Sequence, residues 1–240
     1  MSITRVLLSL ILLGSVCSAL AAAAGERRVQ AGGDSCDPVV SRFFEGDLTV
    51  AVDRKCEAGA FMRVTCRQGS ATVTYASPPG AQRSEISYGG SVQCAVVEEV
   101  TLLGSHASDR LDLSEVRRSE GFPKGRRKFV NGLKGSDIIL GSQFKDDLIA
   151  GVGFQASSSS ADDDRVRGFG GNDYATGGPG EDDIKGGGGD DKLRGGDKAD
   201  ALHGNSGDDT LVGQEGDDTL VGGPGRDSLR GGPGQNALVP

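Results

Sequence analysis

The chain has 240 residues, a net charge of −8 at pH 7 and an isoelectric point near 4.9, and 5% of its residues are aromatic. An acidic chain with few aromatic side chains is disfavoured as a nucleic-acid-binding protein, because such proteins present basic patches. The length suits one ordinary domain together with a repeat block.

Residues 1–24 have the three parts of a signal peptide. Arg5 gives the charged region, Val6–Val16 the apolar region, and Ala22–Ala24 a small-residue cleavage site. The apolar run is short for a membrane-spanning helix, so a retained anchor is only the alternative. A lipoprotein site at Cys17 is disfavoured, because the bulky Val16 precedes it. We therefore expect a secreted, extracellular protein that leaves by the general secretory route, with no membrane span in its mature chain.

Residues 25–113 predict a small β-rich module. Four stretches rich in β-forming residues are separated by turn residues: Leu48–Val52, Met62–Cys66, Ala71–Tyr75 and Val96–Leu103.

Four cysteines remain after the signal peptide, all of them in this module: Cys36, Cys56, Cys66 and Cys94. An even count in an exported chain predicts two disulfides, for which three pairings are open. No C-x-x-C pair occurs, so metal or thioredoxin-type chemistry has no support, and free buried thiols are the alternative.

The module ends in a degenerate nine-residue motif, Gly104–Asp112, in which Asp109 is a candidate site or a plain turn residue. Residues 114–131 then form a basic linker, which could pair with acidic repeats or an anionic surface, or could simply be solvated. Its six positive charges are Arg117, Arg118, Lys124, Arg126, Arg127 and Lys128.

Residues 132–239 consist of twelve consecutive nine-residue registers, such as Gly186–Arg194 and Gly213–Val221, and complete a repeat block over 132–240. Glycine recurs at positions 1, 2 and 4, where positive φ allows a tight turn. Position 8 is apolar in nearly all registers, so one inward side chain flanked by outward ones predicts a three-residue strand. Two registers make a coil of eighteen residues, and stacked coils make a parallel β-roll with a thin core. The apolar residues are Ile139, Leu148, Val166, Ala175, Ile184, Leu193, Leu202, Leu211, Leu220, Leu229 and Leu238.

Aspartate occupies position 6 in ten of the twelve registers, and these residues are the candidate metal ligands. They are Asp137, Asp146, Asp164, Asp173, Asp182, Asp191, Asp200, Asp209, Asp218 and Asp227.

The repeat resembles the G-G-x-G-x-D-x-U-x nonapeptide of RTX (hemolysin-type) calcium-binding proteins. The resemblance covers about half of the chain and implies an all-β fold, in which a C-terminal calcium-stabilised β-roll follows the disulfide-stapled β module. The block holds 10 Lys and Arg against 20 Asp and Glu, so its stacked carboxylates need a cation. Oxygen ligands suit Ca²⁺, whereas Zn²⁺ would need cysteine or paired histidine ligands, which the block lacks. Without calcium, a disordered Gly/Asp-rich tail is expected.

Strict alternation of registers predicts two rows of turns in which neighbouring aspartates are eighteen residues apart. Gln155 would interrupt the row that contains Asp137, and the turn at Asp164 lacks glycine. We therefore expect calcium between residues 168 and 230, and a smaller effect from Asp137→Ala than from Asp191→Ala. The expected rows are Asp137, Gln155, Asp173, Asp191, Asp209 and Asp227, and Asp146, Asp164, Asp182, Asp200, Asp218 and Asn236.

No enzyme is expected. The only histidines are His106 and His203, which excludes an H-E-x-x-H motif, and no G-x-S-x-G motif occurs. Two hypotheses remain: an exported calcium-binding protein with a structural or interaction role, or an adhesin-like surface protein whose N-terminal module binds an unknown extracellular partner.

Overall fold

The computed structural model describes residues 38–44, 47–52, 59–67, 70–76, 84–87, 94–117, 121–122, 128–151 and 162–240. The expected signal peptide, Cys36 and Cys56 lie outside these residues. No helix in the described ranges is long and apolar enough to cross a membrane.

The strands of the N-terminal part correspond closely to the expected β-rich stretches. Three strands, β1, β5 and β7, lie outside these stretches, and the last expected stretch begins as a 3₁₀ turn before its strand. The elements are β1 Pro38–Phe44, β2 Asp47–Val52, β3 Phe61–Arg67, β4 Ser70–Ala76, β5 Ser84–Ser87, η2 Cys94–Val96, β6 Glu99–Leu103 and β7 Arg110–Asp112.

The remaining strands come from the repeats, except that the first of them begins inside the expected linker. They are β8 Lys128–Leu133, β9 Ile138–Leu140, β10 Asp146–Gly151, β11 Arg165–Gly170, β12 Tyr174–Pro179, β13 Asp183–Gly188, β14 Lys192–Asp197, β15 Ala201–Ser206, β16 Thr210–Gln214, β17 Thr219–Val221, β18 Ser228–Arg230 and β19 Ala237–Val239. Many are longer than the three residues expected, because the glycine positions that follow also pair with the next coil, as Gly187 does with Phe169.

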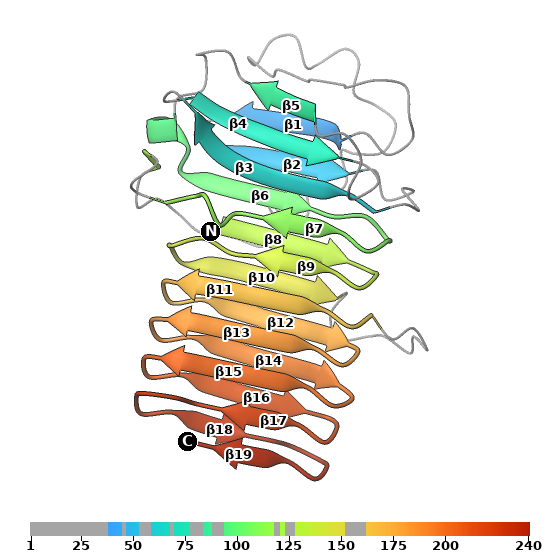
Figure 1. The fold of residues 1–240 in the computed structure, drawn as a ribbon, viewed down its shortest axis with the longest axis vertical. Coiled ribbons are helices and arrows are strands. Elements are labelled where there is room, and N and C mark those ends of the chain that lie inside the picture. The colour runs from blue at the N-terminus through green and yellow to red at the C-terminus, as the bar shows by residue number, and fades with distance from the viewer. Residues whose placement is uncertain are drawn as a thin grey trace.

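These strands form two sheets, and the chain passes from one sheet to the other as it coils around one long axis (Figure 1). In the described residues, one sheet has the order β1-β2-β6-β8-β10-β12-β14-β16-β18 and the other β19-β17-β15-β13-β11-β9-β7-β3-β4-β5. Repeat strands pair in parallel with strands one coil away, so the expected parallel β-roll is confirmed. Antiparallel pairs, β1 with β2, β3 with β4 and β4 with β5, occur at the N-terminal end.

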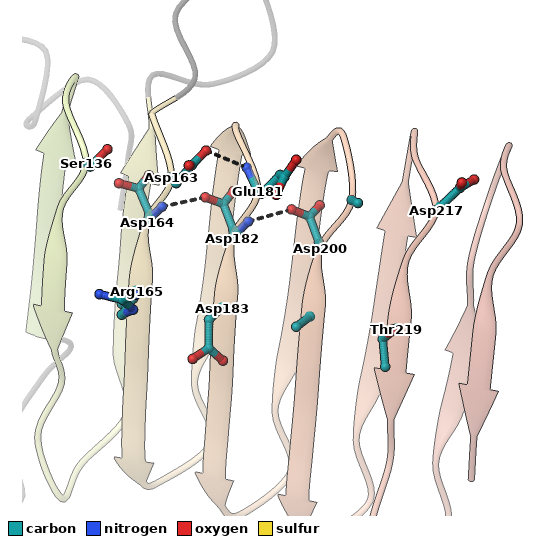
Figure 2. Close-up of a pocket in the computed structure, with 12 residues that line it drawn as sticks. Ser136, Asp163, Asp164, Arg165, Glu181, Asp182, Asp183, Asp200, Asp217 and Thr219 are labelled. Carbon is teal, nitrogen blue, oxygen red and sulfur yellow. Dashed lines mark hydrogen bonds between the residues drawn. The ribbon is translucent and has the colours of Figure 1, made fainter.

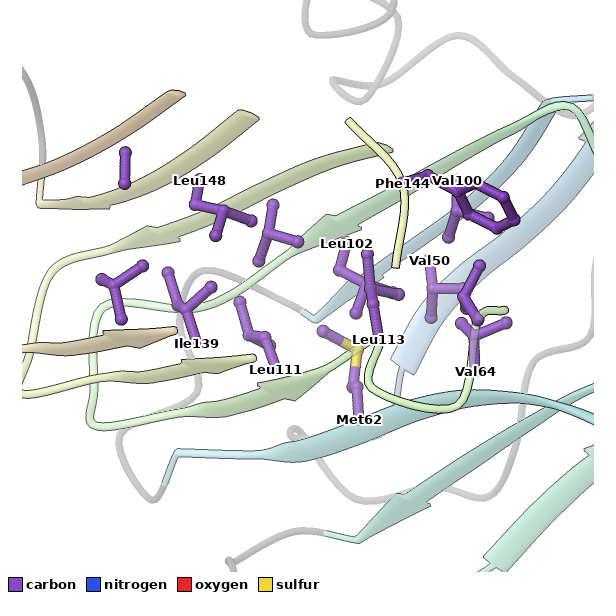
Figure 3. Packing of buried hydrophobic residues seen from close by; sticks show 14 of the residues in the cluster. Val50, Met62, Val64, Val100, Leu102, Leu111, Leu113, Ile139, Phe144 and Leu148 are labelled. Carbon is purple, nitrogen blue, oxygen red and sulfur yellow. The ribbon is translucent and has the colours of Figure 1, made fainter. Parts of the chain in front are cut away.

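The core is the single file of position-8 side chains between the two sheets. It is fully buried from Ile139 to Leu220, partly buried at Leu229 and 46% exposed at Leu238 in the last coil. The file continues into the N-terminal part through Leu111 and Met62, as Figure 3 shows. One apolar cluster therefore runs through both the repeats and the segment before them.

The register spacing changes once within the repeats. Val166 pairs with Ile184, eighteen residues on, but its partner on the other side is Ile139, twenty-seven residues before. The physical reason lies in the register 150–158, which has Ser157 at position 8 and so offers no apolar side chain to the core. One extra register lies between β10 and β11. Each turn before it therefore lies on the edge of the roll opposite to the one that strict alternation predicts.

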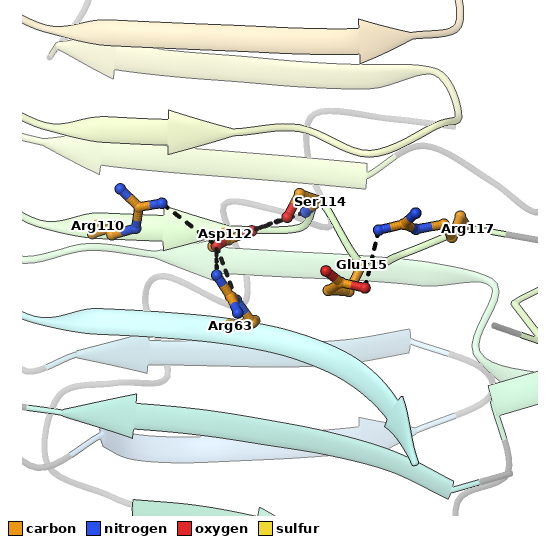
Figure 4. Close-up of polar contacts among 6 residues, drawn as sticks. All are labelled: Arg63, Arg110, Asp112, Ser114, Glu115 and Arg117. Carbon is orange, nitrogen blue, oxygen red and sulfur yellow. Dashed lines mark hydrogen bonds and ion pairs between the residues drawn. The ribbon is translucent and has the colours of Figure 1, made fainter. Parts of the chain in front are cut away.

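The sheets also continue across the expected boundaries at 113 and 131, since β6 pairs with β8 and β7 with β9. A partly buried ion pair links β3 to β7: the carboxylate of Asp112, which is fully buried, accepts from Arg63 Nε at 2.9 Å and from the Ser114 hydroxyl at 2.6 Å (Figure 4). Cys66 and Cys94 form a disulfide. The division of the chain into separate modules remains a prediction.

Candidate metal sites

Each position-6 aspartate lies at the edge of the roll, directly before the strand that carries the next core residue. Its backbone carbonyl already belongs to the strand ladder, as when Asp183 N donates to Asp164 O at 2.9 Å. Its side chain joins a second ladder, in which the amide of one aspartate donates to Oδ1 of the aspartate one coil further on. Asp164 N donates to Asp182 Oδ1 at 2.8 Å, and Asp182 N to Asp200 Oδ1 at 2.9 Å (Figure 2).

These ladders correct the expected rows. Asp137 N donates to Asp164 Oδ1 at 2.6 Å, and Asp146 N donates to Asp173 Oδ1 at 2.9 Å. Asp137 is therefore a neighbour of Asp164 and not of Gln155, because of the extra register between β10 and β11. The observed rows are Asp109, Asp137, Asp164, Asp182, Asp200, Asp218 and Asn236, and Asp146, Asp173, Asp191, Asp209 and Asp227.

The second carboxylate oxygen, Oδ2, is the unusual feature of these side chains. In nine of the ten predicted ligands it is buried and accepts no hydrogen bond. In eight of the nine registers position 1 is glycine, and a β-carbon there, for example at Gly177 beside Asp182, would overlap this oxygen, so glycine makes the room for it. The register of Asp164 lacks this glycine. Buried polar atoms are normally paired, and so a row of orphaned oxygens implies a missing partner. The nine are Asp137, Asp164, Asp173, Asp182, Asp191, Asp200, Asp209, Asp218 and Asp227.

The electrostatics give the charge of that partner. Burial is the largest cause that raises the pKa of the carboxyl groups in the middle of the rows, to about 9 in Asp137, about 8 in Asp164 and Asp200, and about 7 in Asp191. Neighbouring carboxylates in the same row raise the pKa further, as Asp209 does for Asp191. Charged aspartates stacked in this way are costly unless a cation compensates them.

The donor set fits calcium. Among the residues that the structure describes, no group of three or more His, Cys, Asp or Glu side chains gathers at one point. An ion between two coils would thus need backbone carbonyl oxygens in addition to carboxylates, which is the mixed oxygen set that Ca²⁺ accepts. The nine orphaned aspartates would hold it, and when bound it would supply the positive charge that the rows lack.

Asp146 differs from the other nine predicted ligands. Its oxygens accept from Ser142 N at 2.6 Å and from Ser142 Oγ at 2.8 Å, so neither is orphaned. Asp109, treated from the sequence as a turn residue or a site, lies at the head of the other row and is likewise bonded to Ser105.

A third set of contacts, formed by position 5, was missed from the sequence. Asp208 N donates to Asp190 Oδ1 at 3.0 Å, and Asp190 N to Asn172 Oδ1 at 3.2 Å, so this outer ladder runs in the opposite direction to the inner one. The signal that could have revealed it is the acidic pair at positions 5 and 6, as in Asp190-Asp191 and Asp208-Asp209. On the other edge, Asp163, Glu181 and Asp217 line an open groove of about 570 Å³ beside the buried row (Figure 2).

Comparison with known families agrees with this geometry. The family described as the RTX calcium-binding nonapeptide repeat matches four times, at residues 158–184, 176–211, 185–220 and 203–238. No curated protein and no solved structure matches the chain in the corresponding comparisons. RTX nonapeptide repeats bind Ca²⁺. Residues 158–238 are therefore RTX calcium-binding nonapeptide repeats, and they support a calcium-binding structural protein built on a β-roll.

Proposed function

We propose that this is an exported protein whose repeat block folds into the β-roll when it binds external Ca²⁺, and that its role is structural or interactive and not catalytic. The observation that carries the proposal is the pair of rows of buried aspartates, nine of which keep an orphaned Oδ2. No feature of the described residues favours the adhesin-like alternative.

The composition of the repeats supports the coupling of folding to calcium. Ordering a glycine on folding costs roughly 0.5–1 kcal/mol more than ordering an alanine at the same position. The core that must offset this cost in the roll is one file of side chains. A ligand that binds only the folded state shifts the equilibrium toward it. Cytosolic calcium would be too scarce and external calcium sufficient if the affinities are those of extracellular modules, about 10⁻⁴–10⁻³ M.

Export is proposed from residues 1–24, together with the Cys66–Cys94 disulfide, a bond that persists in oxidising compartments. The metal ligands that we propose are the nine aspartates with an orphaned oxygen. We also propose that the protein has no catalytic role, because the aspartate rows serve only to bind cations.

The experiment records the far-UV circular dichroism of the full chain, first after treatment with a chelator and then during a calcium titration. We expect most of the β signal to be lost in the chelator and regained with Ca²⁺, while Mg²⁺ fails to restore it because it demands a smaller, near-octahedral site. A spectrum that is unchanged by chelator and by calcium would overturn the proposal.

A further inference from the structure

We propose that the first turn of each aspartate row takes no calcium, because Ser105, Ser142 and Lys128 already supply the compensation that the metal gives elsewhere. The coils from β6 to β10 then form a metal-independent platform on which the calcium-dependent coils fold. Asp137 is the one proposed ligand in this range, and it bonds to Asp164 of the first calcium-dependent coil, so its site belongs to the boundary between the two parts. This inference rests on the proposed function, since it divides the roll into a part that needs the ion and a part that does not.

The first observation is the saturation of Asp146. Its side chain is fully buried, and Ser142 donates to Oδ2 from its amide at 2.6 Å and to Oδ1 from its hydroxyl at 2.8 Å. In the next coil of the same row, Asp173 Oδ2 is equally enclosed but has no hydrogen-bond partner. Ser142 thus gives Asp146 two hydrogen-bond donors from within its own turn, and the carboxylate of Asp173 has no such donors in its turn.

The second observation is the same arrangement at the head of the other row. Ser105 donates to Asp109 from its amide and, at 3.0 Å, from its hydroxyl, and Ala60 N donates to the other carboxylate oxygen. In both turns the serine hydroxyl also accepts from an amide two residues on, at 3.1 Å from Ala107 and 3.0 Å from Phe144.

The sequence records this duplicated turn as a G-S-x-x-x-D motif, Gly104–Asp109 and Gly141–Asp146. Serine at position 2 therefore replaces the glycine of the calcium-type turn, for example Gly178 in the turn of Asp182. Two independent copies with the same hydrogen bonds indicate a turn type of its own.

The third observation is a built-in cation. Lys128 pairs in register with Asp146 and occupies the equivalent place one coil earlier. Its side chain is fully buried; Nζ donates to the carbonyl of Glu98 at 2.7 Å and lies 5.4 Å from the centre of the Phe144 ring. Burial raises the pKa of Asp146 to about 7, and the hydrogen bonds from Ser142 and the charge of Lys128 act against this rise. Burial lowers the pKa of Lys128, whereas the nearby carboxylates, Asp146 first among them, raise it. The ammonium group of Lys128 therefore compensates part of the charge of the carboxylate that heads this row.

The platform also has the apolar contacts to fold alone. Val100, Leu102, Leu111 and Phe144 of the platform belong to the buried apolar cluster (Figure 3), and so does Val130. By contrast, each coil after β11 contributes little more than two position-8 side chains to the core.

The test is hydrogen exchange of the full chain, measured by mass spectrometry in chelator and in excess Ca²⁺. We expect peptides from residues 99–117 and 128–151 to be protected in both conditions, and peptides from 171–230 to be protected only with calcium. If no peptide responds to calcium, the proposed function fails. If peptides from 128–151 lose their protection in chelator together with the repeats, this inference fails.

A matched pair of variants examines the sites directly. Asp191→Asn removes an orphaned carboxylate and should raise the calcium midpoint about tenfold or more, equivalent to at least about 1.4 kcal/mol. Asp146→Asn should shift the midpoint less than about twofold and leave the number of bound ions, measured by equilibrium dialysis, equal to that of the wild type. An equal shift in the two variants, or one ion fewer in Asp146→Asn, would overturn the proposal. The wild-type exchange experiment decides the question if Asp146→Asn does not fold.

Discussion

Five non-glycine residues hold a positive φ in the part of the chain that the structure describes. Four lie at or next to the ends of strands β8, β11, β15 and β16, where the chain enters a turn, and Lys198 lies in the turn itself; the four are Leu133, Phe169, Asn205 and Gln214. The left-handed region costs an L-residue roughly 1–2 kcal/mol relative to its usual conformations. These positions stand where the repeat otherwise has glycine. Such turns are strained, and the strain is retained because the stacked coils on each side fix the backbone.

Lys198 is the best position for testing this strain, because its side chain is exposed and its charge acts on a proposed ligand, Asp182. We expect Lys198→Gly to lower the calcium midpoint and to stabilise the calcium-loaded roll. The gain should be about 0.5–1 kcal/mol, the relief of strain less the ordering cost of glycine. Removal of a positive charge beside a cation site acts in the same direction.

Lys198→Gln is the control, because it removes the charge and keeps the positive φ at 72°. Calcium titrations that give Lys198→Gly a midpoint equal to or above that of the wild type would contradict the prediction. A Gln variant that matches the Gly variant would assign the whole effect to charge.

At the scale of elements, the ion pair between β3 and β7 links the N-terminal strands to the roll. Asp112 is fully buried and accepts from Arg63 and Ser114, whereas the Arg63 side chain is 29% exposed. We expect Asp112→Asn to lower the free energy of unfolding by about 1–3 kcal/mol, because a hydrogen bond to a charged group is lost. Urea unfolding in excess calcium measures this change.

Glu115→Gln is the matched control (Figure 4). Glu115 pairs with Arg117 at 3.0 Å, but both side chains are about 40% exposed, so the pair should contribute no more than about 1 kcal/mol. Equal effects of the two variants would show that Asp112 does not fasten the two elements.

The elements also show what sequence reasoning can reach. The nine-residue period predicted the core file, since one apolar side chain per register is a local rule that needs no knowledge of neighbouring coils. It did not predict which turns stack, because a single register with Ser157 in the core position shifts the pairing from eighteen residues to twenty-seven. The continuity of β2 and β3 with the roll was also missed, since their parallel partners lie about fifty residues away.

The site was predictable in part for the same reason. Aspartate at position 6 is visible as a column in the sequence, and so are the rows that it forms where the period is unbroken. The saturation of Asp146 by Ser142 and the burial of Lys128 depend on which coil precedes β10. From the sequence, Lys128 was assigned to a basic linker, because its charge alone does not reveal that its side chain is buried.

At the scale of the whole molecule, the roll behaves as a stack in which each coil contacts its neighbours, and the inner ladders link the aspartates of successive coils. The loss of one carboxylate should therefore weaken the adjacent turns. Both rows act on folding through the same quantity, the negative charge that must be buried when the coils close.

That quantity predicts opposite effects of pH with and without calcium. The pKa of Asp164, Asp173 and Asp200 is raised to about 8 in the folded chain, mainly by burial, from 3.8 for a free aspartate. The metal-free folded state thus binds more protons than the unfolded state between these values. Its stability is present below about pH 4 and is lost as the pH rises through the folded pKa near 8. We expect the metal-free chain to gain β structure as the pH falls from about 8 to 5.

In the presence of calcium the direction reverses, because protons and Ca²⁺ compete for the same carboxylates. The calcium midpoint should rise as the pH falls over the same interval. Circular dichroism over a grid of pH and calcium concentration measures both trends in one experiment. Asp191→Asn, which removes one carboxylate from the middle of a row, should reduce both trends without abolishing either. A metal-free chain that loses β structure as the pH falls, or a calcium midpoint that decreases as the pH falls, would show that the buried rows do not control folding.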